Sequence, residues 1–184
     1  NLNLFYGENL GLKNEFKDRI KREFKNAKIL HFYQDEIIKR EEIIYNEIFN
    51  LSLFETERII FIYQVNDKIL EILEKVEKKL NNQKIFLFSE LLDKKSKLRN
   101  FFEKSNSLAI VPCYNDNAVS FKNLILEKLK DFKGLNNENL NLIIDNTNYD
   151  RQKLCNEIEK IKLFFENKNI ERKELEILLN LNIN

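Results

Sequence analysis

The chain has 184 residues, and its 31 basic and 30 acidic side chains leave a formal net charge of +1, which excludes a protein that holds nucleic acid through its overall charge. Two isolated cysteines and a single histidine exclude a disulfide framework and a zinc site. No apolar run approaches the roughly 20 residues of a membrane span, and no signal pattern opens the sequence, so we expect a soluble cytoplasmic protein with one α/β core and a small annex.

Short apolar runs alternate with helix-period segments through the first 112 residues. The predicted strands are Leu2–Tyr6, Lys28–Phe32, Arg58–Val65, Lys84–Phe88 and Leu108–Pro112. The predicted helices between them are Leu12–Phe24, Asp35–Phe49, a segment up to Leu80 capped by Asp67, and Lys94–Lys104. Because parallel strands need long crossover connections, this alternation predicts a five-stranded parallel sheet covered by helices, with the continuously apolar Arg58–Val65 inside it.

The strand signals stop after Pro112. One more helix is predicted from Phe121 to Phe132, and Gly134 is expected to end it. We therefore place a domain boundary there, with an α/β domain over 1–134 and a domain of three short helices over 135–184.

The segment Gly7–Asn14 follows a strand and opens a helix, which is the context of a phosphate-binding loop. A working loop has Gly before its Lys and Ser or Thr after it, whereas Lys13 stands between Leu12 and Asn14. Leu12 hinders close approach of the backbone to phosphates, and Asn14 lacks the hydroxyl that Mg²⁺ requires. We interpret Gly7, Leu12, Lys13 and Asn14 as a degenerate nucleotide loop.

A second requirement of an ATPase also fails. No predicted strand ends in a pair of acidic residues that could hold Mg²⁺; the nearest candidates are Asp67, interpreted as a helix cap, and Glu90, interpreted as a solvated loop residue. We therefore expect no ATP hydrolysis, no catalytic residue, no metal and no cofactor.

The stretch Ser52-Leu53-Phe54 places two large apolar side chains in a polar connection. Leu53 and Phe54 either fold inward as the start of the next strand or form an exposed anchor for a partner. Two further features have plainer interpretations. His31 is expected to be structural, and the basic cluster Lys94, Lys95, Lys97 and Arg99 is expected to be a solvated helix face that could also meet DNA phosphates.

Four features, in this order, resemble the delta subunit of bacterial DNA polymerase III, of the clamp-loader family. They are the degenerate loop, the Ser-Leu-Phe element, Leu92–Leu98 after the fourth strand, and Leu154–Ile161 near the end. The resemblance implies an AAA+ type α/β domain followed by a three-helix lid. It also implies a C-terminal collar domain that is missing from this sequence, which agrees with the absence of any Met in suggesting a piece of a longer product.

The same resemblance implies a function. The delta subunit binds and opens the beta sliding clamp during DNA replication. It is a subunit of a nucleotidyltransferase holoenzyme, and the delta subunit itself has no ATPase activity. Ser52, Leu53 and Phe54 would bind the clamp, and other partners would be the delta prime and gamma or tau type subunits and, through the assembled complex, primed DNA. Two rival functions stay open, an active P-loop NTPase or kinase and a stand-alone nucleic-acid-binding module.

Overall fold

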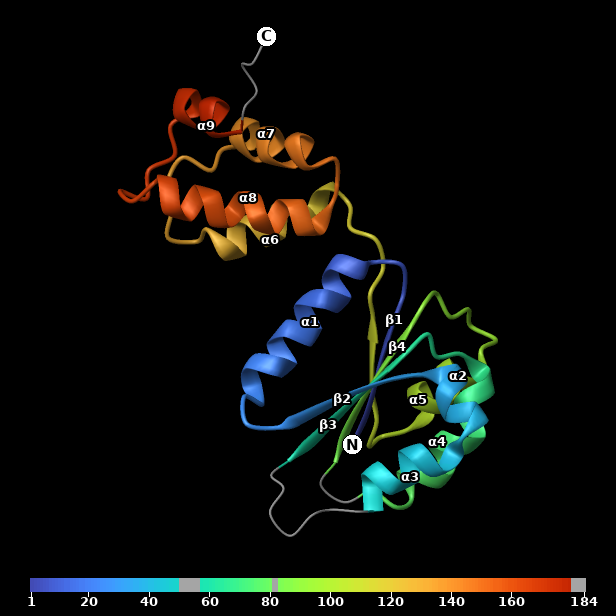
Figure 1. Cartoon of the computed structure of the whole chain (residues 1–184). Coiled ribbons are helices and arrows are strands. Elements are labelled where there is room, and N and C mark those ends of the chain that lie inside the picture. The colour runs from blue at the N-terminus through green and yellow to red at the C-terminus, as the bar shows by residue number, and fades with distance from the viewer. Residues whose placement is uncertain (50–56, 81–82, 180–184) are drawn as a thin grey trace. The chain divides into compact units, whose positions relative to one another are not determined.

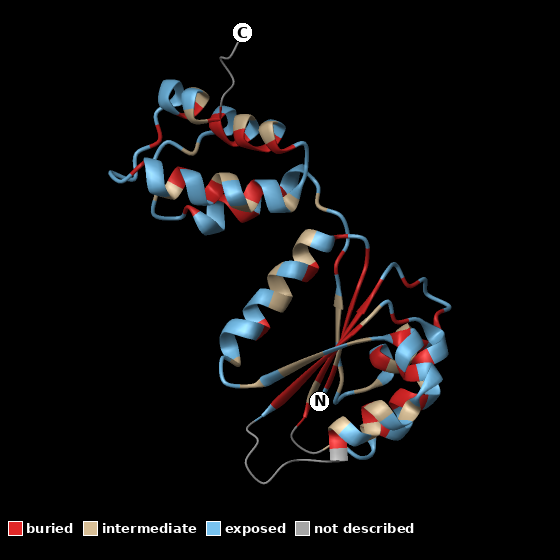
Figure 2. Ribbon diagram, in the orientation of Figure 1, coloured by how far each residue is buried: buried red, intermediate tan, exposed pale blue. Residues whose placement is uncertain are grey.

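The computed structural model describes residues 1–49, 57–80 and 83–179. The chain forms two compact units, Asn1–Asn115 and Asp116–Asn184. Each unit has its own hydrophobic core (Figure 2). Within the described residues, no helix has the length and the apolar character that crossing a membrane would require.

The first unit is built on a parallel sheet of five strands (Figure 1). They are β1 (Leu2–Tyr6), β2 (Lys28–Tyr33), β3 (Arg58–Tyr63), β4 (Lys84–Ser89) and β5 (Ala109–Pro112). The strand order is β2-β3-β4-β1-β5, so β3 lies inside the sheet as its apolar run predicts, next to the central β4. The register pairs Leu4 of β1 with Leu87 of β4 and Ile110 of β5. The predicted strands and their parallel arrangement are confirmed.

Helices cover both faces of this sheet (Figure 1). Among the described helices of this unit, α1 (Leu10–Glu23) lies on one face. The other face carries α2 (Gln34–Lys39), α3 (Glu41–Phe49), α4 (Leu70–Glu77) and α5 (Lys97–Lys104). Side chains of β3 alternate between the two layers, as the period of a strand requires. Ile59 and Phe61 pack with residues of α1, while Ile60 and Ile62 pack with those of the opposite helices.

Two local predictions were wrong in detail. The helix expected over 35–49 is divided at Arg40, whose φ of −144° and ψ of 76° end α2, and the sequence has no Gly or Pro there to signal the break. Asp67 does not cap the helix that follows it. It begins a single 3₁₀ turn, Asp67–Ile69, whose capping side chain is that of Asn66, which accepts a hydrogen bond from the Lys68 N–H.

The second unit contains the described helices α6 (Ala118–Lys128), α7 (Asn137–Thr147), α8 (Arg151–Phe164) and α9 (Arg172–Leu178). The boundary lies after Asn115 and not after Gly134, because buried side chains of α6, such as Phe121 and Ile125, pack in the core of α7 and α8. Helix α6 ends at Lys128. Gly134 instead lies in a loop with φ of +85°, where a β-carbon would come within 2.2 Å of the Ile170 carbonyl oxygen.

Candidate functional site

The loop after β1 is held closely against the ends of two neighbouring strands. The Gly7 N–H donates to the Glu90 carbonyl beyond β4 at 3.2 Å, and the Asn9 N–H donates to the Cys113 carbonyl beyond β5 at 3.0 Å. Gly7 has φ of +131°, and a β-carbon there would lie 2.1 Å from the Cys113 oxygen. The loop therefore requires glycine at this position because both its backbone conformation and its packing leave no room for a side chain.

The N-terminus of α1 is capped by the chain itself. Asn9 Oδ1 accepts from the Leu12 N–H at 2.9 Å, and the Asn9 carbonyl accepts from the Lys13 N–H at 3.1 Å. Amide groups of a first helical turn are the ones that bind phosphate in a nucleotide-binding loop. Here the side chain of Asn9 occupies one of them, the Leu12 N–H, whereas the Lys13 N–H makes the first regular bond of the helix. Leu12 packs in the α1 layer of the core, and Asn14 is exposed.

The side chain of Lys13 is buried and bonded to the backbone. Its side chain is 6% exposed, and its ammonium group donates to the Gly7 carbonyl at 2.8 Å and to the Ser89 carbonyl at 3.0 Å. Burial lowers the pKa of this group below its usual value. The lysine thus links the ends of β1 and β4 through backbone oxygens. This is a structural use of the residue that occupies the lysine position of a phosphate-binding loop.

The end of β3 carries Tyr63 and Gln64 where an active ATPase would need acidic residues facing the loop. Of the two acidic candidates, Glu90 lines a cavity beside Lys13. Asp67 is bonded elsewhere, as described next. Across the described parts of the chain, no cluster of three or more His, Cys, Asp or Glu residues could hold a metal ion.

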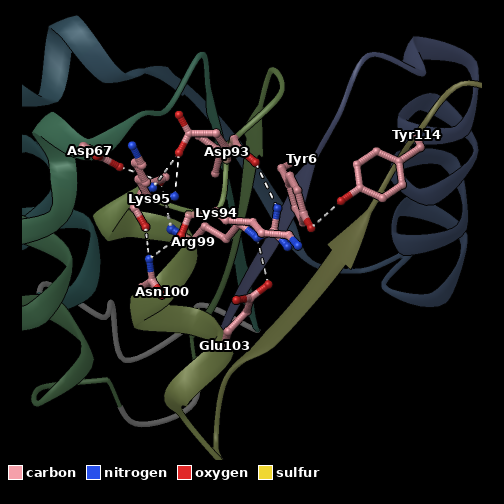
Figure 3. A network of polar contacts seen from close by, with 11 residues as sticks. Tyr6, Asp67, Asp93, Lys94, Lys95, Arg99, Asn100, Glu103 and Tyr114 are labelled. Carbon is pink, nitrogen blue, oxygen red and sulfur yellow. Dashed lines mark hydrogen bonds and ion pairs between the residues drawn. The ribbon is translucent and has the colours of Figure 1, made fainter.

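Asp67 caps α5, a helix that begins thirty residues later (Figure 3). Its Oδ1 accepts from the Ser96 hydroxyl at 2.6 Å and from the Leu98 N–H at 3.0 Å, and its Oδ2 accepts from the Lys97 N–H at 3.1 Å. Burial alone would raise the pKa of Asp67, but these hydrogen bonds together hold the pKa below its usual value. This use of Asp67 could not be foreseen because the capped helix is distant in the sequence.

The basic cluster divides into exposed and engaged members (Figure 3). Lys94, Lys95 and Lys97 are exposed, as expected. The helix predicted from Lys94 begins only at Lys97, so Lys94 and Lys95 lie in the preceding turn and not on a helix face. Arg99 differs, because its side chain is only 15% exposed and bonds both the Glu103 carboxylate at 2.8 Å and the Leu92 carbonyl at 3.1 Å.

Arg99 also reaches a pair of tyrosines that the sequence analysis missed. Its guanidinium lies 5.1 Å from the centre of the Tyr6 ring, and the Tyr6 and Tyr114 hydroxyls are 2.9 Å apart (Figure 3). Burial, followed by the bond to Tyr114, raises the pKa of Tyr6 to about 12. This network joins the end of β1 to the segment after β5, so we interpret Arg99 as structural.

A cavity of about 560 Å³ opens at the carboxyl ends of the strands, beside α1. Its lining includes Lys17, His31, Tyr33 and Tyr63. His31 Nδ1 lies 2.8 Å from the Tyr63 hydroxyl, and the two rings are stacked. The Lys17 ammonium lies 5.5 Å from the centre of the Tyr63 ring. No local pattern predicts this cluster, because its aromatic residues come from two strands and its lysine from a helix.

The predicted clamp-binding residues Ser52, Leu53 and Phe54 lie outside the described residues.

Comparison with known proteins shows which solved structures share this fold. No protein-family model and no curated protein sequence matches the chain. Among solved structures, the Bacillus subtilis DNA clamp loader delta protein is similar with a TM-score of 0.74 and 17% identity, over 96% of this chain and 57% of that one. The Thermotoga maritima RuvB Holliday junction branch migration motor is similar with a TM-score of 0.54 and 12% identity, over 99% of this chain and 62% of that one.

These likenesses show the α/β fold that the sequence predicts, a parallel sheet flanked by helices. The chain spans just over half the length of the delta structure.

Proposed function

We propose that this chain is a delta-like subunit of a DNA clamp loader, which binds a ring-shaped sliding clamp and favours its open form without hydrolysing ATP. Two observations support the proposal. The fold of the delta protein extends over 96% of the chain. The expectation that the chain does not hydrolyse ATP rests on Lys13, whose ammonium group donates to the Gly7 and Ser89 carbonyls. It also rests on the end of β3, which has Tyr63 and Gln64 in place of acidic residues.

The clamp-binding residues in this proposal are Ser52, Leu53 and Phe54, with Ser52 shaping the turn. Burying a Leu and a Phe in a partner's pocket yields roughly 1.5–3 kcal/mol each, so the pair can dominate one contact. Opening a ring requires differential binding, because the subunit shifts the clamp only as far as it holds the open form more tightly than the closed one.

The remaining partners belong to the assembled loader. We propose delta prime and gamma or tau type subunits as neighbours, and primed DNA as the target of the complex. ATP would act through those neighbours, which would expose or hide the clamp-binding surface.

Capture of the sliding clamp from the same organism tests the proposal. The double variant Leu53→Ala/Phe54→Ala should weaken clamp binding at least about tenfold in a surface-binding assay, because it removes both apolar anchors. The chain provides a matched control in Leu163→Ala/Phe164→Ala, another adjacent Leu-Phe pair, 78% and 50% exposed in the second unit. Equal binding by the two double variants would contradict the site, and no binding by the parent chain would contradict the function.

Calorimetry with Mg²⁺ and ATP separates the proposal from its enzymatic rival. We expect no micromolar affinity, because the Leu12 N–H and the Lys13 ammonium are already bonded within the loop. Micromolar binding that is lost in Lys13→Met would instead favour an active P-loop protein. Tight, strongly salt-dependent binding of DNA by the chain alone would favour the nucleic-acid-binding alternative.

A further inference from the structure

The strand β2 forms one border of the sheet. Within the described residues, β2 pairs only with β3, along all six positions from Lys28 to Tyr33. A border strand of this length presents a row of backbone donors and acceptors to another chain, and proteins usually cover or interrupt such edges.

The register identifies the backbone groups that face outward. The Lys28 N–H donates to the Glu57 carbonyl at 3.1 Å, so the backbone N–H and C=O groups of Lys28 face β3. Because the direction alternates along a strand, Ile29, His31 and Tyr33 direct their N–H and C=O groups outward. The Tyr33 N–H donates to the Glu36 carboxylate at 2.9 Å. Ile29 and His31 are therefore the residues able to pair with an added strand.

A cavity lies on each face of the sheet beside this edge. On the α1 face is the cavity of about 560 Å³ lined by Lys17, His31, Tyr33 and Tyr63. On the opposite face, a cavity of about 420 Å³ is lined by His31, Phe32, Ile43 and three charged residues of the α2 region. Successive side chains of an extended peptide point to opposite faces, so a strand added to β2 would direct alternate side chains into the two cavities.

The charges around the edge are mainly positive. Burial and, after it, the positive charges of Lys21 and Lys17 on α1 lower the pKa of His31. Lys39 and Arg40 line the cavity on the opposite face. Two carboxylates also face these cavities. Glu36 is bonded to the Tyr33 N–H, and Glu90 lies in the lining of the larger cavity. Charge complementarity therefore favours an acidic occupant.

We propose that the outer edge of β2 binds an extended acidic segment of a partner protein by strand addition, with Ile29 and His31 supplying the backbone hydrogen bonds and the two cavities receiving alternate side chains. The proposal does not depend on clamp loading, because the segment 52–54 takes no part in it.

A capped synthetic peptide of alternating glutamate and valine is the probe, titrated into the isotope-labelled chain and followed by NMR. Saturable binding should shift the amide signals of Ile29 and His31. Ile29→Pro should weaken binding on the order of tenfold, because it removes an outward donor while every bond to β3 remains. Ile29→Val is the matched control, since it shortens the same side chain and keeps the N–H, and it should bind like the parent.

Modified peptides keep the test independent of how Ile29→Pro folds. Methylation of alternate peptide nitrogens removes the donors that face β2, and replacing glutamate by lysine reverses the charge. Both peptides should lose binding to the unmodified chain. The proposal is overturned by an absence of saturable binding, by equal binding of the methylated peptide, or by self-association through Ile29 that makes a second copy the occupant.

Discussion

Asp67 provides a direct test of how the α/β unit is held together. Its carboxylate accepts hydrogen bonds from the Lys97 and Leu98 N–H groups at the start of α5 and from the Ser96 hydroxyl, which itself accepts from the Arg99 N–H at 3.1 Å. Loss of a helix cap costs about 1 kcal/mol, and loss of a negative charge at a helix N-terminus costs about 0.3–1 kcal/mol. Asp67→Ala should therefore lower the free energy of unfolding by about 1–2 kcal/mol near neutral pH.

Asp67→Asn separates the charge from the hydrogen bonds. The amide can keep an oxygen toward Ser96 and Leu98, but its NH₂ group would then face the Lys97 N–H, so the cost should be about 1 kcal/mol. The pKa of Asp67 is lowered in the folded state, so its stabilisation is present above the unfolded value of 3.8 and is lost as the pH falls through the lower, folded value. The difference between the parent and Asp67→Asn should be constant from about pH 7 to pH 5 and shrink below about pH 4.

Urea unfolding followed by circular dichroism, at several pH values, measures both effects. Glu71→Gln is a suitable control, because Glu71 is an exposed acid in the first turn of α4, and its loss should cost only a few tenths of a kcal/mol. The reasoning is refuted if Asp67→Asn is as stable as the parent near neutral pH, or if the difference between them persists unchanged into the acid range.

Three further changes test the loop and the second unit. Lys13→Met should lower the unfolding free energy by about 1–3 kcal/mol in urea titration, because two buried carbonyls lose a charged donor; an unchanged midpoint would contradict the inward geometry. Gly7→Ala should cost about 2 kcal/mol or more, whereas Gly11→Ala, inside α1, should be neutral or stabilising, and equal effects would contradict the positive φ at Gly7. Arg151→Ala should destabilise the second unit by about 2–3 kcal/mol, measured by thermal unfolding, because its guanidinium bonds both oxygens of the largely buried Asp116. The double variant Arg151→Ala/Asp116→Ala should cost less than the sum of the two single changes.

Much of the fold could be predicted because local patterns report which side of a segment is apolar. The run Leu2–Tyr6 and its glycine identify β1 and the turn after it, and the spacing of Leu12, Phe16 and Ile20 identifies the buried side of α1. The same patterns, in alternation, predict the parallel sheet and its helical layers. The degenerate loop was also recognisable from residue types alone, although its chemistry stays a prediction.

Placement of polar groups across the fold could not be predicted in the same way. Asp67 reads as a cap for the nearest helix, yet it caps α5 because the sheet brings the ends of β3 and β4 together. Helix α6 follows a strand, yet it joins the second unit because the apolar partners of Phe121 lie there. Neither the helix that Asp67 caps nor the unit that α6 joins is indicated by the residues next to them in the sequence.

The sequence by itself determined the order of strands and helices, the balance of charge and the substitutions around Lys13, because these depend on residue type and spacing. Tertiary structure decided that the Lys13 ammonium bonds backbone carbonyls, that Arg99 joins a tyrosine pair and that β2 borders the sheet between two cavities. The physical reason is that a hydrogen bond or a cavity is defined by groups distant in the chain, whose separation only the packing of the whole sheet sets.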